Sequence, residues 1–336
     1  METRKLQQVG GGTYTVSIPK EWAVEHRLEA GAEVHLYAHG DGSIVVRSAA
    51  KDGGRLEATR VELDGGDPAL AARVVRAAHA AGYGTVTLVG SFTDADRRAV
   101  RSLTRSLVGA TVPTATADEI TVRSVLDASD VAVRQWVVQL RFVALSVHRQ
   151  AASAFVGGEQ GASDRLRARA EEAARLRETV ARHASRSLVS FAEVDRLDAT
   201  RPELFDYDAV ARRLAGVADR GVRVARAGER LSSPLPGGVA DDVDAVAERA
   251  DRLVTDAVDA VLDGAGVGEV RSVLDDCERA RADLDDLERT LFETVEGSMA
   301  DGRALTRALD GLDRTVAAAD DVAAVALRAA LRDDGR

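Results

Sequence analysis

The sequence predicts a mainly α-helical protein with a β-rich N-terminus. Hydrophobic residues make up 45% of its 336 residues but aromatic residues only 4%, so the core must consist of many small aliphatic contacts, which packed helices provide. Short segments separated by glycine turns occupy the N-terminus, whereas apolar residues recur at helical spacing from about residue 129 onward. A chain of this length is expected to form more than one domain.

Residues 1–50 form the first predicted domain, with short strands around one helix. Glycine-rich turns at 10–12 and 40–42 separate strands expected at 4–8, 13–18, 33–37 and 43–47, and the helix is expected near 20–26. Five short elements in about fifty residues cannot enclose a good core in one chain. We therefore expect this domain to dimerise.

Residues 55–125 form the second predicted domain, a small α/β unit in which strands and helices alternate. Strands are expected at 56–63, 85–89, 111–115 and 120–123, with helices starting at Pro68 and running from Thr93 to Val108. Asp67 and Thr93 are suitable N-caps, because a side-chain oxygen can accept hydrogen bonds from the free amides of the first helical turn. No function can be derived from these residues.

From about residue 129 the apolar period is helical, and six helical stripes follow one another. The first stripe consists of Val133, Val137, Leu140, Ala144, Val147, Ala151 and Phe155. The other stripes lie near 164–190, 206–231, 239–263, 268–297 and 301–332. A proline-rich break at 233–238 divides the helices into three plus three, so we expect two similar three-helix units at 129–235 and 239–333.

The charge pattern is typical of a protein that stays soluble in concentrated salt. The formal net charge is −10, and nearly all cationic residues are arginine, with lysine only at Lys5, Lys20 and Lys51. We interpret this composition as that of a halophilic archaeon with a GC-rich genome. The single cysteine, Cys277, cannot form an internal disulfide, and no apolar stretch is long enough to span a membrane. We expect a cytoplasmic protein without membrane insertion.

The N-terminal motifs, residues 4–6, 13–22 and 28–31, resemble the AbrB/SpoVT/MazE family, in which two chains exchange hairpins to form one barrel. The resemblance implies a swapped-hairpin homodimer that binds DNA through Arg4, Lys5, Thr13, Tyr14, Ser17, Lys20 and Arg27. Arginine, lysine and hydroxyl groups are the donors that phosphate contacts require. However, residues 1–50 hold five cationic and six anionic side chains, which gives no strong basic footprint. The alternative is a module that only dimerises.

The helical region resembles PhoU-type phosphate-uptake regulators, particularly archaeal ones with an AbrB-like N-terminus. The resemblance is carried by residues 133–149, 193–197, 211–219, 309–315 and 325–327. It implies two PhoU-like three-helix bundles and a phosphate transporter or sensor protein as a possible partner.

A PhoU-like fold also implies a metal site, but this sequence holds only part of it. The family places two carboxylates four residues apart on the third helix of each unit, where they share one face and can hold a divalent or iron-like metal. Here Ala215 precedes Asp219 and Ala317 follows Asp313, so each pair keeps one carboxylate. The candidate ligands are Glu193, Asp195, Asp219 and Asp313, with the first two at the end of an earlier helix. The favoured alternative is that the carboxylates are solvated or paired with Arg213 and Arg314.

No catalytic arrangement is visible. The histidines, including His35, His39, His148 and His183, lack zinc-ligand spacing, and there is no phosphate-binding loop or nucleophile elbow. We therefore predict that the chain is not an enzyme and assign it no cofactor.

The predicted function is a DNA-binding, phosphate-responsive transcriptional or signalling regulator of phosphate uptake and intracellular phosphate homeostasis. The alternative is an adaptor that does not bind DNA and negatively regulates a phosphate ABC transporter through protein contacts. An AbrB-like antitoxin is a third interpretation, which a co-purifying toxin would support. An enzyme or a metal-storage protein would require the carboxylates missing at Ala215 and Ala317.

Overall fold

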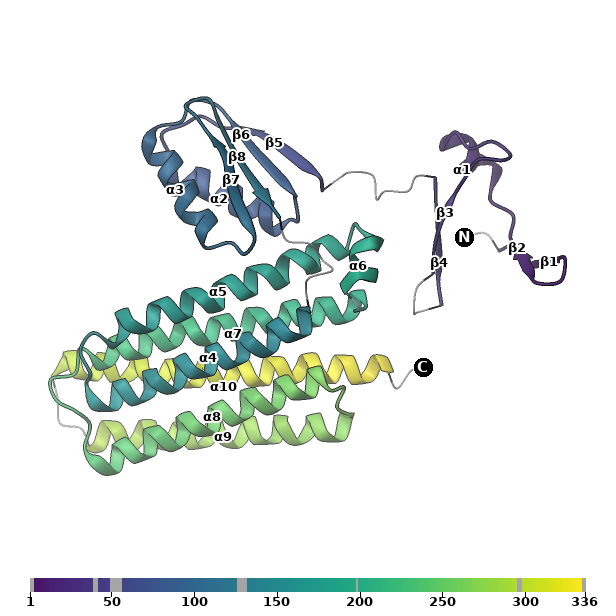
Figure 1. The fold of residues 1–336 in the computed structure, drawn as a ribbon. Coiled ribbons are helices and arrows are strands. Elements are labelled where there is room, and N and C mark those ends of the chain that lie inside the picture. Colours follow the sequence, from purple (N-terminus) through teal and green to yellow (C-terminus); the bar gives the residue numbers. More distant parts are fainter. Residues whose placement is uncertain are drawn as a thin grey trace. The chain divides into compact units, whose positions relative to one another are not determined.

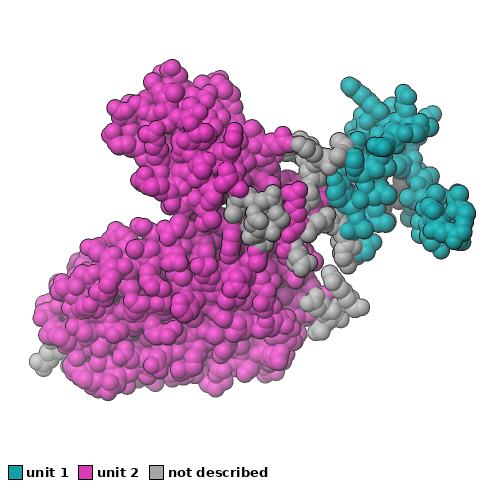
Figure 2. Space-filling view, viewed as in Figure 1, with its two compact units in different colours: residues 1–54 teal, residues 55–336 magenta. Residues whose placement is uncertain are grey.

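The computed structural model describes residues 3–38, 42–48, 56–125, 132–197, 199–294 and 298–333. The side chains of Ala192, Asp195, Thr294 and Asp333 lie outside this description. The chain divides into two compact units, residues 1–54 and 55–336 (Figure 2).

The first unit consists of two hairpins and one short helix. Strands β1 (Gln7–Val9) and β2 (Thr13–Thr15) pair antiparallel, as do β3 (His35–Ala38) and β4 (Ile44–Arg47), and α1 (Lys20–Glu25) lies between the hairpins in sequence. All five predicted elements are present, but β1 covers residues 7–9 rather than 4–8 and β2 covers 13–15 rather than 13–18, since the pairing register of this hairpin runs from Gln7 with Thr15 to Val9 with Thr13. Gly10 adopts a φ of 65° in the first turn, and most of the predicted second turn, residues 39–41, lies outside the described residues.

The second unit begins with a four-stranded sheet and two helices (Figure 1). Its elements are β5 (Ala58–Glu62), α2 (Pro68–Ala80), β6 (Thr85–Val89), α3 (Asp94–Arg105), β7 (Ala110–Ala115) and β8 (Glu119–Ser124). The strand order is β5-β6-β8-β7; β5 and β6 are parallel, and the other two pairs are antiparallel. The elements match the α/β pattern predicted from sequence.

One face of this sheet packs on both helices. Alternate residues of the central strands β6 and β8 are buried and join apolar residues of α2 and α3 in one core, formed by Ala71, Val75, Val86, Leu88, Phe92, Val100, Leu103, Leu107, Ile120 and Val122. Both predicted helix caps are confirmed. Asp67 Oδ1 accepts a hydrogen bond from the Leu70 amide (2.9 Å), and Thr93 forms a capping box with Asp96.

The rest of the second unit is helical. Its long helices are α4 (Val133–Gly157), α5 (Ala162–Ser187), α7 (Arg201–Gly228), α8 (Gly237–Leu262), α9 (Val267–Thr294) and α10 (Met299–Asp333), and a short α6 (Phe191–Leu197) follows α5. Gly158 ends α4 with a φ of 62°, and Thr200 starts α7 with a capping box to Glu203. No helix in the described ranges combines the length and apolar character that crossing a membrane requires.

The long helices fall into two sets of three that share one apolar core. Helices α4, α5 and α7 pack on one another, as do α8, α9 and α10, and the sets meet where α7 contacts α10 and α4 contacts α8 (Figure 1). All seven residues of the first predicted stripe, from Val133 to Phe155, are buried. Gly228 allows α7 to approach α4 closely, because a Cβ atom there would lie 2.6 Å from the Phe155 Cα atom. The likeness to PhoU and the four domain boundaries remain predictions.

Candidate nucleic-acid interface

The first unit has no core of its own. None of its described residues is buried, and the two apolar cores found among the described residues belong to the second unit. Its large apolar side chains are exposed instead: Leu6, Val9, Tyr14, Val16, Ile18, Val24, Leu36 and Ile44. Burying one such side chain typically stabilises a fold by about 1.5–3 kcal/mol. A second copy that covered these side chains would therefore provide the core that one chain lacks.

The residues predicted to contact DNA all lie on this unit and are all exposed: Arg4, Lys5, Thr13, Tyr14, Ser17, Lys20 and Arg27. Arg4 and Lys5 precede β1 and Ser17 follows β2, so these three residues lie at the open end of the first hairpin, whereas Thr13 adjoins its turn.

The helix α1 carries two of the predicted contacts. Lys20 is its first residue, and Arg27 follows its C-terminus with a φ of 55°, a left-handed conformation that few residues other than glycine adopt. Trp22 stacks on His26 with ring centroids 4.6 Å apart, and His26 Nδ1 lies 2.9 Å from the Trp22 carbonyl oxygen. The stack supports the end of α1 immediately before Arg27.

The predicted metal ligands lie in different surroundings. Glu193 was expected at the end of an earlier helix, but it lies on the separate helix α6, because α5 ends at Ser187 and the Ser190 hydroxyl accepts a hydrogen bond from the Glu193 amide (3.1 Å). The Glu193 carboxylate is buried and contacts His183 Nδ1 (2.6 Å) and Arg186 Nε (2.9 Å). Burial alone would raise its pKa, but the hydrogen bonds and charges of His183 and Arg186 hold the pKa below its usual value.

Asp219 is exposed on α7 and pairs with Arg223 (2.6 Å). Arg213 and Arg314, the predicted partners of the helix carboxylates, form ion pairs with other residues. Arg213 pairs with Asp321, and Arg314 pairs with Asp310. Asp313 lines a shallow acidic hollow between α9 and α10, and the Asp195 side chain lies outside the description. Within the described ranges, no three histidine, cysteine or carboxylate side chains form a group that could hold a metal ion.

Two buried histidine–carboxylate pairs were missed by sequence analysis. One is His183 with Glu193, and the other is His148 Nδ1 with Asp251 Oδ1 (2.7 Å), where Asp251 also accepts from Arg149 Nε (3.0 Å). The second pair joins α4 to α8 across the two sets of helices, and its members are 103 positions apart in the sequence. No local sequence pattern could reveal such a contact.

Two arginines of α5 join the helical region to the α/β part. Arg182 Nη1 donates to the His79 carbonyl oxygen (2.6 Å), and Arg186 Nη1 donates to the Gly82 carbonyl oxygen (2.7 Å). The His79 carbonyl belongs to the last turn of α2, and the Gly82 carbonyl lies two residues beyond the helix; a positive charge is favourable at this end of the helix dipole. Burial and the charge of Arg186 lower the pKa of Arg182 to about 10, so it stays protonated at neutral pH.

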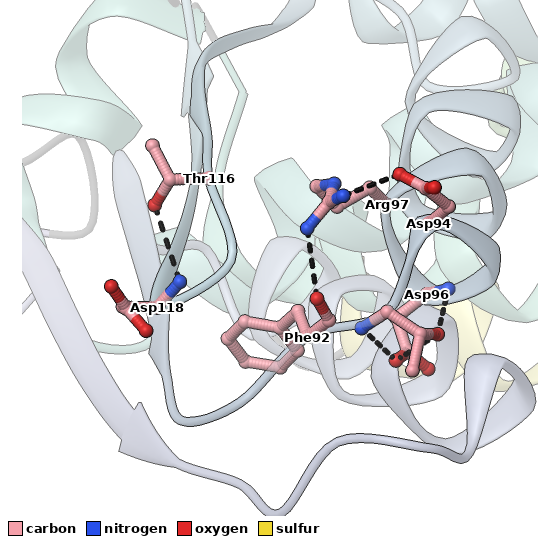
Figure 3. Close-up of polar contacts among 7 residues, drawn as sticks. Phe92, Asp94, Asp96, Arg97, Thr116 and Asp118 are labelled. Carbon is pink, nitrogen blue, oxygen red and sulfur yellow. Dashed lines mark hydrogen bonds and ion pairs between the residues drawn. The ribbon is translucent and has the colours of Figure 1, made fainter.

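The loops that follow β5 and β6 are held by internal contacts (Figure 3). Asp96 is fully buried, and its Oδ2 accepts hydrogen bonds from the Gly66 amide (3.0 Å), the Thr93 amide (2.8 Å) and the Thr93 hydroxyl (2.7 Å). The hydrogen bond from the Thr93 side chain is the main reason that the pKa of Asp96 lies below its usual value. Arg97 donates to the Phe92 carbonyl oxygen (2.8 Å) and pairs with Asp94. These side chains therefore stabilise the loops.

Comparison with known proteins identifies one part of the chain. Residues 7–55 match the family model described as antidote-toxin recognition MazE, bacterial antitoxin. No curated protein matches the chain. The match covers the first unit from residue 7 onward, so Arg4 and Lys5 lie outside it, and it covers only a small share of the 336 residues. The N-terminal unit, which carries the seven exposed candidate DNA contacts, is thus similar to the MazE family.

Proposed function

We propose that the chain is a homodimeric regulator that binds DNA through its first fifty residues and controls phosphate uptake. The match of residues 7–55 to the MazE family carries this proposal, because MazE/AbrB-like domains commonly bind DNA and dimerise. The exposed cations Arg4, Lys5, Lys20 and Arg27 supply donors for phosphate oxygens of the DNA backbone.

The lack of a core in the first unit supports the dimer. Two hairpins and a six-residue helix without any buried residue cannot be stable alone, since a small fold needs an apolar core or an added constraint. The interface would be the N-terminal hairpins.

The phosphate-related part of the proposal rests on the resemblance of the helical region to PhoU. In this proposal, the protein acts in the cytoplasm, and the helical bundles receive phosphate status from a transporter or a sensor protein. The long helices occupy the six predicted positions, which is compatible with such a bundle.

The first test is genome-wide DNA occupancy at native salt in phosphate-rich and phosphate-starved cells. The intact protein is compared with a variant that carries Arg4→Ala, Lys5→Ala and Lys20→Ala. A matched control carries Arg98→Ala, Arg303→Ala and Arg307→Ala, which removes three exposed cations of the second unit.

We expect discrete peaks that the N-terminal variant loses and the control keeps, with occupancy at phosphate-transport promoters changing with supply. Peaks that do not respond to phosphate would refute the phosphate part alone. No discrete occupancy in either condition would refute DNA binding and favour the adaptor that inhibits a phosphate ABC transporter.

An antitoxin is a second candidate, because the description of the matching family names toxin recognition. It predicts a small toxin that co-purifies with the chain and that the first unit releases when its exposed apolar side chains are changed to aspartate. Purification from the native host without such a companion protein would count against it.

A further inference from the structure

The second unit contains a cavity of about 560 Å³ between its α/β part and its helical part. Helices α2, α3 and α5 line the cavity, and its charged and hydroxyl-bearing wall residues include Arg73, Arg76, Ser102, Glu171, Arg175 and Glu178. Its volume lies in the range that suits small organic ligands, which often bind between two structural layers. It adjoins the contact in which Arg182 and Arg186 of α5 hold the end of α2.

Three arginines and one serine supply donors in the wall of the cavity. Arg73 and Arg76 come from α2, Arg175 comes from α5, and the hydroxyl of Ser102 comes from α3, whereas the Ser106 hydroxyl already donates to the Leu103 carbonyl oxygen (2.6 Å). Arginine binds phosphoryl oxygens through two parallel N–H groups, and hydroxyl groups add further donors. Hydrogen-bond donors from α2, α3 and α5 therefore line the same cavity.

The wall also holds two carboxylates, Glu171 and Glu178, against its three arginines, so one positive charge remains in excess. Glu178 is buried and paired inside the protein, with Arg76 Nε at 3.3 Å and Arg177 Nη2 at 3.8 Å. Within the described part of the chain, neither Arg73 nor Arg175 has a carboxylate within ion-pair distance. These two arginines therefore keep their charge available to a ligand.

We propose that this cavity binds a small organic phosphate of the sugar or polyol phosphate class. The phosphoryl group would lie between Arg73 and Arg175. The other residues of the wall suit the sugar or polyol part of the ligand. Glu171 can accept hydrogen bonds from the ligand's hydroxyl groups, and the methyl groups of Ala72, Ala99 and Ala174 can pack against the ligand's carbon atoms. Inorganic phosphate alone would leave most of the cavity unfilled.

Such a ligand would contact both parts of the second unit. It would hold α2 and α3 of the α/β part against α5 of the bundle and strengthen the contact made by Arg182 and Arg186. This site goes beyond the proposed DNA binding and does not depend on it.

Calorimetric titration of the full-length protein without DNA tests the proposal. The probe is glucose 6-phosphate, with glucose and inorganic phosphate titrated in parallel at constant ionic strength. We expect saturable binding of glucose 6-phosphate, no binding of glucose, and binding of inorganic phosphate that is at least about tenfold weaker, because it lacks the contacts of the sugar.

Variants locate the site. Arg73→Ala combined with Arg175→Ala is expected to weaken binding of glucose 6-phosphate by at least about tenfold. Arg98→Ala combined with Arg303→Ala removes two exposed charges elsewhere in the same unit and should leave binding unchanged. Circular dichroism verifies that both variants keep their helical content.

Three results would overturn the proposal. The first is the absence of glucose 6-phosphate binding to the intact protein. The second is equal binding by the Arg73/Arg175 variant, which would place the site elsewhere. The third is inorganic phosphate binding as tightly as glucose 6-phosphate, which would show that the cavity does not recognise an organic phosphate.

Discussion

The buried side chain of His79 should make the stability of the protein depend on pH between about 4 and 6.5. It lies near the end of α2, is only 4% exposed, and neither ring nitrogen has a hydrogen-bond partner among the described residues. Burial, followed by the charges of Arg182 and His183, lowers its pKa from 6.5 to about 4. The folded protein therefore holds His79 neutral at a pH where the unfolded chain protonates it.

The direction and the size of the change in the free energy of unfolding follow from the lowered pKa of His79. As pH falls below 6.5, the unfolded state binds a proton that the folded state excludes until about pH 4, so the free energy of unfolding decreases. One pKa unit corresponds to about 1.4 kcal/mol, so the decrease between pH 7 and pH 5 is about 2 kcal/mol. Below pH 4.5 the unfolded chain also protonates carboxylates whose pKa values are lowered in the folded state, such as Asp96 and Glu193, and this decreases the free energy of unfolding further.

Urea denaturation at pH 7 and pH 5, followed by circular dichroism, measures this effect. His79→Leu should remove about 2 kcal/mol of the pH dependence, because the substituted side chain cannot be protonated. His26→Leu is the control, since His26 is exposed on the first unit. If His79→Leu keeps the full pH dependence of the intact protein, the explanation through His79 is wrong.

Three further substitutions test the packing, a helix cap and the dimer. Phe155→Ala should lower the free energy of unfolding by about 3–5 kcal/mol in urea denaturation, because Phe155 is buried in the bundle core, whereas Phe142→Ala at an exposed position should change it by less than about 0.5 kcal/mol. Equal effects would contradict the packing described. Thr200→Ala should cost about 1 kcal/mol in the same assay through loss of the α7 capping box, and an unchanged midpoint would argue against that cap. Leu36→Asp combined with Ile44→Asp should convert the proposed dimer to a monomer in sedimentation analysis, and an unchanged dimer would place the interface elsewhere.

The sequence predicted best those features that depend on neighbouring residues. The helical stripe from Val133 to Phe155 and the caps at Asp67 and Thr93 were correct, because periodicity and capping are local properties of the chain. The strands of the first unit were predicted in the right places but too long. The register of the first hairpin ends at the pair of Gln7 and Thr15, and periodicity does not reveal where the pairing of two strands stops.

Contacts between distant segments could not be predicted. His148 with Asp251 and Arg182 with the His79 carbonyl each join residues 103 positions apart, and a single sequence does not specify which long-range pairs meet. Asp219 was expected to be solvated or paired with an arginine; it is exposed and pairs with Arg223, one turn further along α7. The cavity is likewise formed by α2, α3 and α5, of which α5 follows only after more than fifty intervening residues.

The arginine contacts at the end of α2 also set the order in which the protein can be completed during synthesis. Helix α2 ends at Ala80, whereas Arg182 and Arg186 are added about a hundred residues later. At the usual rates of translation, about 5–20 residues per second, the ribosome needs several seconds to reach them. The α/β part ends at Ser124, so its strands and helices are synthesised before Arg182 and Arg186 are available to donate to the His79 and Gly82 carbonyls. The α/β part can therefore make these contacts with the bundle only late in synthesis, after α5 has been made.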